Sequence, residues 1–200
     1  MEAKRILLIR HGESLSNKGR VLTGRGDPDL TRSGIAQARK ISLFIRKKYS
    51  PIDRIFSSPL KRALSTAREI SRKVKATVET SELLIETDFG KWEGMTHEML
   101  RNQQGWEHYL NDPFHFNFPG GESPQDVKSR ILLFREQLFS EDGWNTVVVV
   151  SHYTPIVFFT LSILGNAHTS RAPFRIDNAS LTVIERSGGS DYIAMMNFTP

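Results

Sequence analysis

The chain has 200 residues, of which 38% are hydrophobic and 24% charged, which is enough for one domain with a sizeable core. It contains no cysteine, which excludes disulfides and thiolate catalysis. No apolar run approaches the roughly 20 residues of a membrane helix, and the scattered basic residues form no nucleic-acid-binding motif. The net charge of +5 fits either an ordinary basic surface or attraction of an anionic substrate. We expect a cytoplasmic protein with one domain over 1–200 and neither a membrane nor a nucleic-acid partner.

Apolar periodicity predicts strands that alternate with helices along most of the chain. Strands are expected at 4–10, 53–57, 77–80 and 146–151, followed by a closing hairpin at 180–185 and 192–197. Helices are expected at 32–49, at 59–75 beginning with Ser58-Pro59, at 123–140 and at 155–164. The segments 12–30 and 81–121 are predicted to be irregular, with one short helix near 96–104. This order predicts an α/β fold: a three-layer sandwich with a mostly parallel central sheet, helices on both faces and an antiparallel C-terminal hairpin.

Two histidines each follow an apolar run, at the predicted carboxyl end of a strand. The run 6–9 leads into Arg10-His11-Gly12, and the run 147–150 leads into Ser151-His152. Ligands of open α/β sheets bind at these strand ends, and Gly12 permits a sharp turn that brings backbone N–H groups close to an anion. Arg62 lies in the first turn of a predicted helix, where the backbone also favours an anion. The pattern favours phosphoryl chemistry through a histidine nucleophile.

A series of motifs resembles the histidine phosphatase superfamily, which includes the cofactor-dependent phosphoglycerate mutases. The resemblance covers nearly the whole chain, and it implies a phosphoglycerate mutase-like fold. The motifs are Arg10-His11-Gly12-Glu13-Ser14 with Asn17, Leu22-Thr23-Gly24 with 29–34, Ser57-Ser58-Pro59-Leu60-Lys61-Arg62-Ala63, the segment 86–94, Pro119-Gly120-Gly121-Glu122-Ser123, and Ser151-His152. The segment from Trp92-Glu93-Gly94 to 119–123 also resembles broad-specificity phosphatases and α-ribazole phosphatases.

The resemblance assigns roles to the residues at the strand ends. His11 is expected to attack phosphorus and form a phosphohistidine, with its other ring N–H held by a backbone carbonyl. Arg10 and Arg62 are expected to hold the phosphoryl oxygens, and a protonated His152 would stabilise charge in the transition state.

Further residues complete the predicted site. Asn17, Thr23 and Gly24 are expected to contact the phosphate. Glu86 is the expected general acid and base, because it precedes Phe89-Gly90 at the family spacing; the rival carboxylates are Asp88, Glu82 and Glu93. No metal or organic cofactor is implied, since the arginines would neutralise the phosphate.

Tyr153 departs from the family pattern, which often has glycine after the late histidine. It is expected either to form a pocket wall and contact the substrate or to pack against Trp92 or the loop. The aromatic segment 114–118 leaves a similar choice: it forms a lid that selects an apolar or ring-bearing ester, or it anchors a satellite core.

The segment 86–121, a predicted lid or insert, favours a phosphatase over a mutase. It is short and aromatic-rich, it lacks the mutases' paired arginines, and Thr87-Asp88-Phe89-Gly90 replaces their Arg-His-Tyr-Gly. We expect a phosphomonoesterase acting on a small phosphorylated metabolite. The alternatives are a cofactor-dependent phosphoglycerate mutase-type transfer and a non-catalytic phospholigand-binding module.

Overall fold

A central mixed sheet organises the molecule. The computed structural model describes residues 4–165 and 171–200, and its six-stranded sheet has the order β3-β2-β4-β1-β5-β6. Strand β1 pairs in parallel with β4, β4 with β2, and β2 with β3, whereas β5 runs antiparallel to both β1 and β6. The strands are β1 (Lys4–Arg10), β2 (Arg54–Ser57), β3 (Val78–Thr80), β4 (Thr146–Ser151), β5 (Leu181–Ser187) and β6 (Ser190–Phe198). The predicted mostly parallel sheet with an antiparallel C-terminal hairpin is confirmed.

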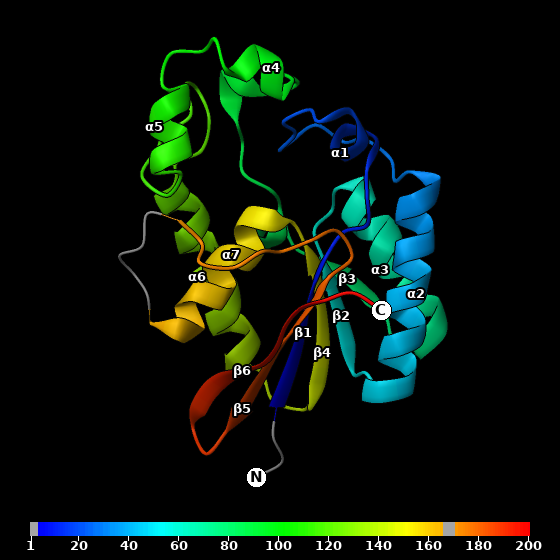
Figure 1. The fold of residues 1–200 in the computed structure, drawn as a ribbon. Helices are drawn as coiled ribbons and strands as arrows, with labels where there is room; N and C mark the ends of the chain where they lie inside the picture. The colour runs from blue at the N-terminus through cyan, green and yellow to red at the C-terminus, as the bar shows by residue number, and fades with distance from the viewer. Residues whose placement is uncertain (1–3, 166–170) are drawn as a thin grey trace.

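Helices cover both faces of this sheet, as Figure 1 shows. Helices α2 (Arg32–Tyr49) and α3 (Lys61–Val74) lie on one face, and α6 (Pro124–Ser140) and α7 (Tyr153–Leu164) lie on the other. Side chains alternate along a strand, so Leu7 and Ile9 join the core under α2 and α3, while Ile6 and Leu8 join the core under α6 and α7. The predicted three-layer sandwich is confirmed.

The central position of β4 determines where the two predicted histidines lie. Every residue of β4 is buried, and the strand lies between β1 and β2. In the register of β1 with β4, Arg10 is opposite Ser151. His11 and His152, the next residue of each strand, therefore leave the sheet side by side at its carboxyl edge.

Short elements lie above this edge of the sheet (Figure 1). They are α1 (Leu15–Gly19), α4 (His97–Leu100), α5 (Trp106–Asn111) and two 3₁₀ turns, η1 (Glu82–Leu84) and η2 (Gly90–Trp92). The sequence analysis missed α1 and α5 and placed one longer helix at 96–104. Neither α1 nor α5 has a fully buried residue, so neither shows the apolar stripe that periodicity detects.

Two long helices begin elsewhere than predicted. Helix α3 begins at Lys61 instead of Pro59, and Leu60 precedes it without a side-chain cap. Helix α7 begins at Tyr153, which places Pro155 inside the first turn, where a missing N–H is tolerated. The closing hairpin turns at Gly188-Gly189, whose positive φ angles of 59° and 83° suit a tight two-residue turn. Over 4–165 and 171–200, no helix is long and apolar enough to cross a membrane.

Candidate active site

The two histidines face each other at the carboxyl edge of the sheet. Their ring centroids are 5.1 Å apart, and both residues are buried, with 4% of His11 and 0% of His152 exposed. The Nδ1 atom of His11 lies 2.7 Å from the carbonyl oxygen of Gly12. Because a carbonyl only accepts, Nδ1 carries the proton and Nε2 keeps its lone pair. The backbone carbonyl predicted to hold His11 is therefore present.

The surroundings of His11 keep it neutral. Burial, and then the positive charges of Arg10 and Arg62, lower the pKa of His11 well below its usual value of 6.5. The hydrogen bond that His11 donates to the Gly12 carbonyl opposes this shift but ranks last among the causes. A neutral imidazole with a free Nε2 is the form that attacks an electrophile.

The two predicted phosphate-binding arginines are buried and held by backbone carbonyls. Arg62, 2% exposed, donates from Nη1 to Gly26 at 2.7 Å and from Nη2 to Gly24 at 2.8 Å. Arg10 donates from Nη1 to the carbonyl of Ile176 at 2.7 Å, while its buried Nε has no partner among the described residues. Burial lowers the pKa of both guanidinium groups, although both stay charged. Carbonyls orient these arginines without neutralising their charge, so the site favours an anion.

His152 is held from below by a serine hydroxyl. Its Nε2 lies 2.7 Å from Oγ of Ser58, and its buried Nδ1 has no partner in the described part of the chain. Burial, followed by the charge of Arg62, lowers the pKa of His152 well below 6.5. The sequence analysis gave His152 a stabilising role in the case that its ring is protonated. The structure favours the neutral form, because the ring is buried and two buried arginines already supply positive charge here.

Glu86 is the carboxylate that reaches the candidate site. It lines the cavity together with Arg10, and its Oε1 accepts a bond from the backbone N–H of Thr87 at 2.9 Å. The rival carboxylates hold backbone turns. Asp88 accepts from the N–H of Gly90 at 2.8 Å, and Glu93 accepts from the N–H groups of Gly24, Arg25 and Phe89. Glu82 begins the turn η1. The geometry favours Glu86 as the proton donor.

A cavity of about 570 Å³ opens above this cluster. Five predicted site residues line it: Arg10, Asn17, Thr23, Glu86 and Tyr153. Gly24 lies behind the wall, because its N–H goes to Glu93 and its carbonyl to Arg62. A side chain at Gly24 would place Cβ 1.7 Å from the carbonyl oxygen of Thr87, so only glycine fits there. Gly24 therefore supports Arg62 and has no N–H left for a ligand.

Hydrogen bonds to Oδ1 fix the side-chain amide of Asn17, so that its Nδ2 can donate to a ligand. Its Oδ1 accepts bonds from the N–H and hydroxyl of Ser14 and from Nδ2 of Asn178. Asn178 also donates to the backbone carbonyl of His11 at 3.1 Å. The sequence analysis missed Asn178, whose only local signal is a glycosylation-type triplet. It comes near His11 because β5, which follows it, pairs with β1.

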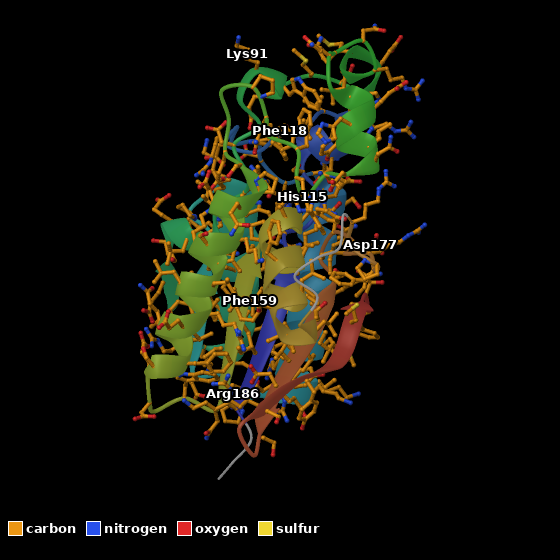
Figure 2. The ribbon with its side chains drawn as sticks, turned by 90° about the vertical axis from the view of Figure 1, so that its left-hand side faces the viewer. Lys91, His115, Phe118, Phe159, Asp177 and Arg186 are labelled. Carbon is orange, nitrogen blue, oxygen red and sulfur yellow. The ribbon has the colours of Figure 1, made fainter. Side chains whose placement is uncertain are left out.

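Aromatic side chains form the outer part of the cavity. Phe89, Tyr109, Phe114 and Phe118 line it, and Phe116 lies buried beside Phe118 with ring centroids 5.2 Å apart. The segment 114–118 thus anchors a satellite core and also contributes to the cavity wall. Figure 2 shows Phe118 above His115, whose exposed ring contacts Asp112.

Tyr153 forms a wall of the cavity. The guanidinium carbon of Arg10 lies 5.6 Å from the centre of its ring, and burial raises the pKa of its hydroxyl. The pocket-wall interpretation therefore fits Tyr153 better than packing against Trp92. Among the residues that the structure describes, no cluster of histidine and acidic side chains could hold a metal ion.

Comparison with known proteins gives a consistent answer. Residues 6–199 match the model of the histidine phosphatase superfamily (branch 1). The chain is 34% identical over 197 residues to phosphoserine phosphatase 1 of Hydrogenobacter thermophilus, covering 98% of this chain and 92% of that protein. A mycobacterial glucosyl-3-phosphoglycerate phosphatase structure in complex with VO3 is 26% identical, with a TM-score of 0.86, over 98% of this chain and 100% of that one. A phosphoserine phosphatase of Entamoeba histolytica in complex with 3-phosphoglyceric acid is 28% identical, with a TM-score of 0.81, over 98% of each chain.

Proposed function

The chain belongs to the histidine phosphatase superfamily and is a phosphatase, a hydrolase of phosphoric monoesters, and we propose that it acts through a phosphohistidine on His11 with Glu86 as general acid and base. One observation carries this assignment. The His11 imidazole is neutral, its Nδ1–H is held by the Gly12 carbonyl, and it lies close to the positive charges of Arg10 and Arg62.

In the first step, Nε2 of His11 attacks the phosphorus of the bound ester. The Nε2–P bond forms as the P–O bond to the alcohol breaks, and Glu86 gives its proton to the departing oxygen. Arg10, Arg62 and the amide nitrogen of Asn17 hold the phosphoryl oxygens during transfer. The products of this step are the free alcohol and a phosphohistidine.

In the second step, the Glu86 carboxylate takes a proton from water, whose oxygen attacks the phosphohistidine. The Nε2–P bond breaks, phosphate is released, His11 returns to the neutral imidazole and Glu86 is again protonated. Glu86 lines the same cavity as Arg10, and its charge also acts on Arg62, which suits both proton transfers.

His152 contributes as a neutral donor, with Ser58 as its positioning residue. Ser58 Oγ accepts from the N–H of Leu60 at 3.3 Å, so its own proton is available to His152 Nε2 at 2.7 Å. Nε2 then accepts, the ring proton resides on Nδ1, and Nδ1–H donates to a phosphoryl oxygen. This arrangement stabilises charge in the transition state without adding a third cation.

The remaining predicted features belong to the same proposal. Thr23 and Tyr153 contact the substrate from the cavity wall, and Gly24 acts through Arg62. Residues 1–200 form one catalytic domain with an insert at 86–121 that covers the site. The substrate is a small phosphorylated metabolite, handled in the cytoplasm without a metal or organic cofactor.

The test is phosphate release from a panel of phosphomonoesters with chelator present, for the wild type, His11→Ala and Glu86→Gln. We expect release by the wild type, none above background by His11→Ala, and at least a hundredfold lower kcat for Glu86→Gln. His115→Ala, at an exposed histidine, is the matched control and should keep full activity. Equal release by His11→Ala would overturn the assignment, and transfer that depends on bisphosphoglycerate would show a mutase.

A further inference from the structure

We propose that the leaving alcohol of the substrate carries a flat apolar ring, which binds between Tyr153 and an aromatic wall formed by Phe89, Tyr109 and Phe118. This inference rests on the proposed phosphatase function and adds the chemical class of the leaving group. It follows from where these rings lie relative to the phosphate site and from what else lines the cavity.

Tyr153 lies where the leaving group must pass. It is the first residue of α7 and directly follows His152, and its ring is 5.6 Å from the guanidinium carbon of Arg10. Because Arg10 holds the phosphoryl group, the Tyr153 ring borders the ester oxygen and the first atoms of the alcohol. The residue is 38% exposed, so much of its surface is free for contact with a ligand.

The rings of the aromatic wall pack closely against one another. The ring centroids of Phe89 and Phe118 are 4.8 Å apart, and those of Phe118 and Tyr109 are 5.5 Å apart. Trp92, buried behind them, lies 5.6 Å from Phe118 and 5.8 Å from Tyr109. These rings pack against one another above α6 and α7, where Figure 2 shows Phe118. A preformed wall loses little conformational freedom on binding a ring.

The lining of the cavity is mixed. Polar side chains contribute part of it, including Arg10, Asn17 and Glu86, which are assigned to the phosphoryl chemistry. The apolar part comes largely from the aromatic rings and continues to Leu110, which is partly exposed. A ring-bearing alcohol would cover this apolar surface, whereas a small polar alcohol would leave it in contact with water.

The cavity also has room for a ring. Its volume of about 570 Å³ lies within the range of pockets that enclose whole organic ligands, roughly 300–1,000 Å³. An aromatic ligand ring would complete offset-stacked or edge-to-face contacts with the two sides. The combination of a packed aromatic wall, an exposed tyrosine beside Arg10 and a cavity with room for a ring favours a ring-bearing ester.

The test compares esters whose alcohols have similar reactivity: 2-phenylethyl phosphate, ethyl phosphate, glycerol 3-phosphate and phosphoserine. For the wild type we expect kcat/KM for 2-phenylethyl phosphate to exceed that for ethyl phosphate by about tenfold or more, mainly through KM. Tyr153→Thr should reduce this ratio to about threefold or less, and Tyr153→Phe should preserve it. Tyr192→Thr, at a tyrosine of similar exposure on β6, is the matched control and should leave the ratio unchanged.

Several outcomes would overturn the inference while leaving the phosphatase function intact. These are equal hydrolysis of ethyl and 2-phenylethyl phosphate, a preference for phosphoserine, or an unchanged ratio in Tyr153→Thr. If no ester is hydrolysed, the proposed function fails. Calorimetry that compares the affinities for 2-phenylethylphosphonate and ethylphosphonate still tests the proposed ring site. Similar affinities for the two phosphonates would refute it.

Discussion

Replacing Ser58 by alanine tests how the second imidazole is held. The Ser58 hydroxyl and His152 are both fully buried, and the Oγ–Nε2 distance is 2.7 Å. In Ser58→Ala the Nε2 atom loses its donor, so the ring proton can move from Nδ1 to Nε2. Nδ1 would then present a lone pair to the phosphoryl oxygens in place of an N–H, which replaces an attraction with a repulsion.

The size of the effect follows from this change. Leaving a buried ring nitrogen without its partner costs about 1–3 kcal/mol of unfolding free energy. Losing one hydrogen bond from Nδ1–H to a charged phosphoryl oxygen costs about 1.5–3 kcal/mol in the transition state, or about ten- to a hundredfold in kcat. KM should change less, because the arginines still hold the phosphate.

The assay measures kcat, KM and the ¹⁵N shifts of His152 in Ser58→Ala, with Ser57→Ala as control. Ser57 is an equally buried neighbour whose hydroxyl donates to the Ser58 carbonyl at 2.8 Å and does not reach His152. Both variants should lose similar stability, but only Ser58→Ala should lose kcat and change the tautomer. An equal loss of kcat in both variants, or an unchanged tautomer in Ser58→Ala, would refute the reasoning.

Three further predictions follow from the same site. Because burial and nearby arginines lower the pKa of His11, the acid limb of kcat/KM should have its midpoint below pH 6.5. The unfolded chain protonates this imidazole near pH 6.5 and the native state does not, so the unfolding free energy should fall as pH drops below 6.5. Urea titrations at several pH values should show that the unfolding free energy of His11→Gln depends less steeply on pH than that of the wild type. The same pH dependence in both proteins would contradict this. Glu93→Gln should lower the unfolding free energy measured in urea by about 1–3 kcal/mol and raise KM, because the Glu93 carboxylate accepts bonds from three backbone N–H groups. An unchanged KM would show that the loop at Gly24 stays in place without this carboxylate. Inorganic phosphate at a hundred times its Kd should raise the unfolding free energy of the wild type by about 2.7 kcal/mol, as measured by thermal unfolding. Arg62→Ala should remove this stabilisation. If the stabilisation persists in Arg62→Ala, the anion binds elsewhere.

The sequence predicted the strand ends well because short, continuous apolar runs leave little ambiguity. The runs before His11 and His152 became β1 and β4, and the neighbouring arrangement of these strands brings the two imidazoles together. Helix α1 was missed because the capping box of Ser14 and Asn17 holds it, without a buried face.

Other features could not be predicted locally, since tertiary contacts determine them. The start of α3 was placed too early because Ser58 looks like a helix cap, whereas its hydroxyl is committed to His152. Asn178 reaches His11 only through the pairing of β5 with β1, which nothing in its local sequence signals. The charge state of His152 could not be predicted from the sequence, because the combined effect of burial and two arginines appears only in the folded molecule.

The partners of the arginines explain why the site favours an anion. Elsewhere in the chain, Arg54 and Arg130 pair with the carboxylates of Glu79 and Glu122, which neutralise them. Arg62 instead binds the carbonyls of Gly24 and Gly26, so it is oriented but its charge remains available. Carbonyl support also ties the arginine to a backbone loop, so the position of that loop sets the geometry of phosphate binding.

That loop is held by a carboxylate outside the cavity lining. Glu93 binds the N–H groups of Gly24 and Arg25, while the Gly24 carbonyl holds Arg62. Close packing of Gly24 against the Thr87 carbonyl joins the same loop to the backbone next to Glu86. Arg62, which we propose binds phosphate, and Glu86, the proposed proton donor, are thus positioned by one packed unit. A change at Glu93 should therefore affect phosphate affinity and proton transfer together, whereas a change at Tyr153 should affect only the choice of alcohol.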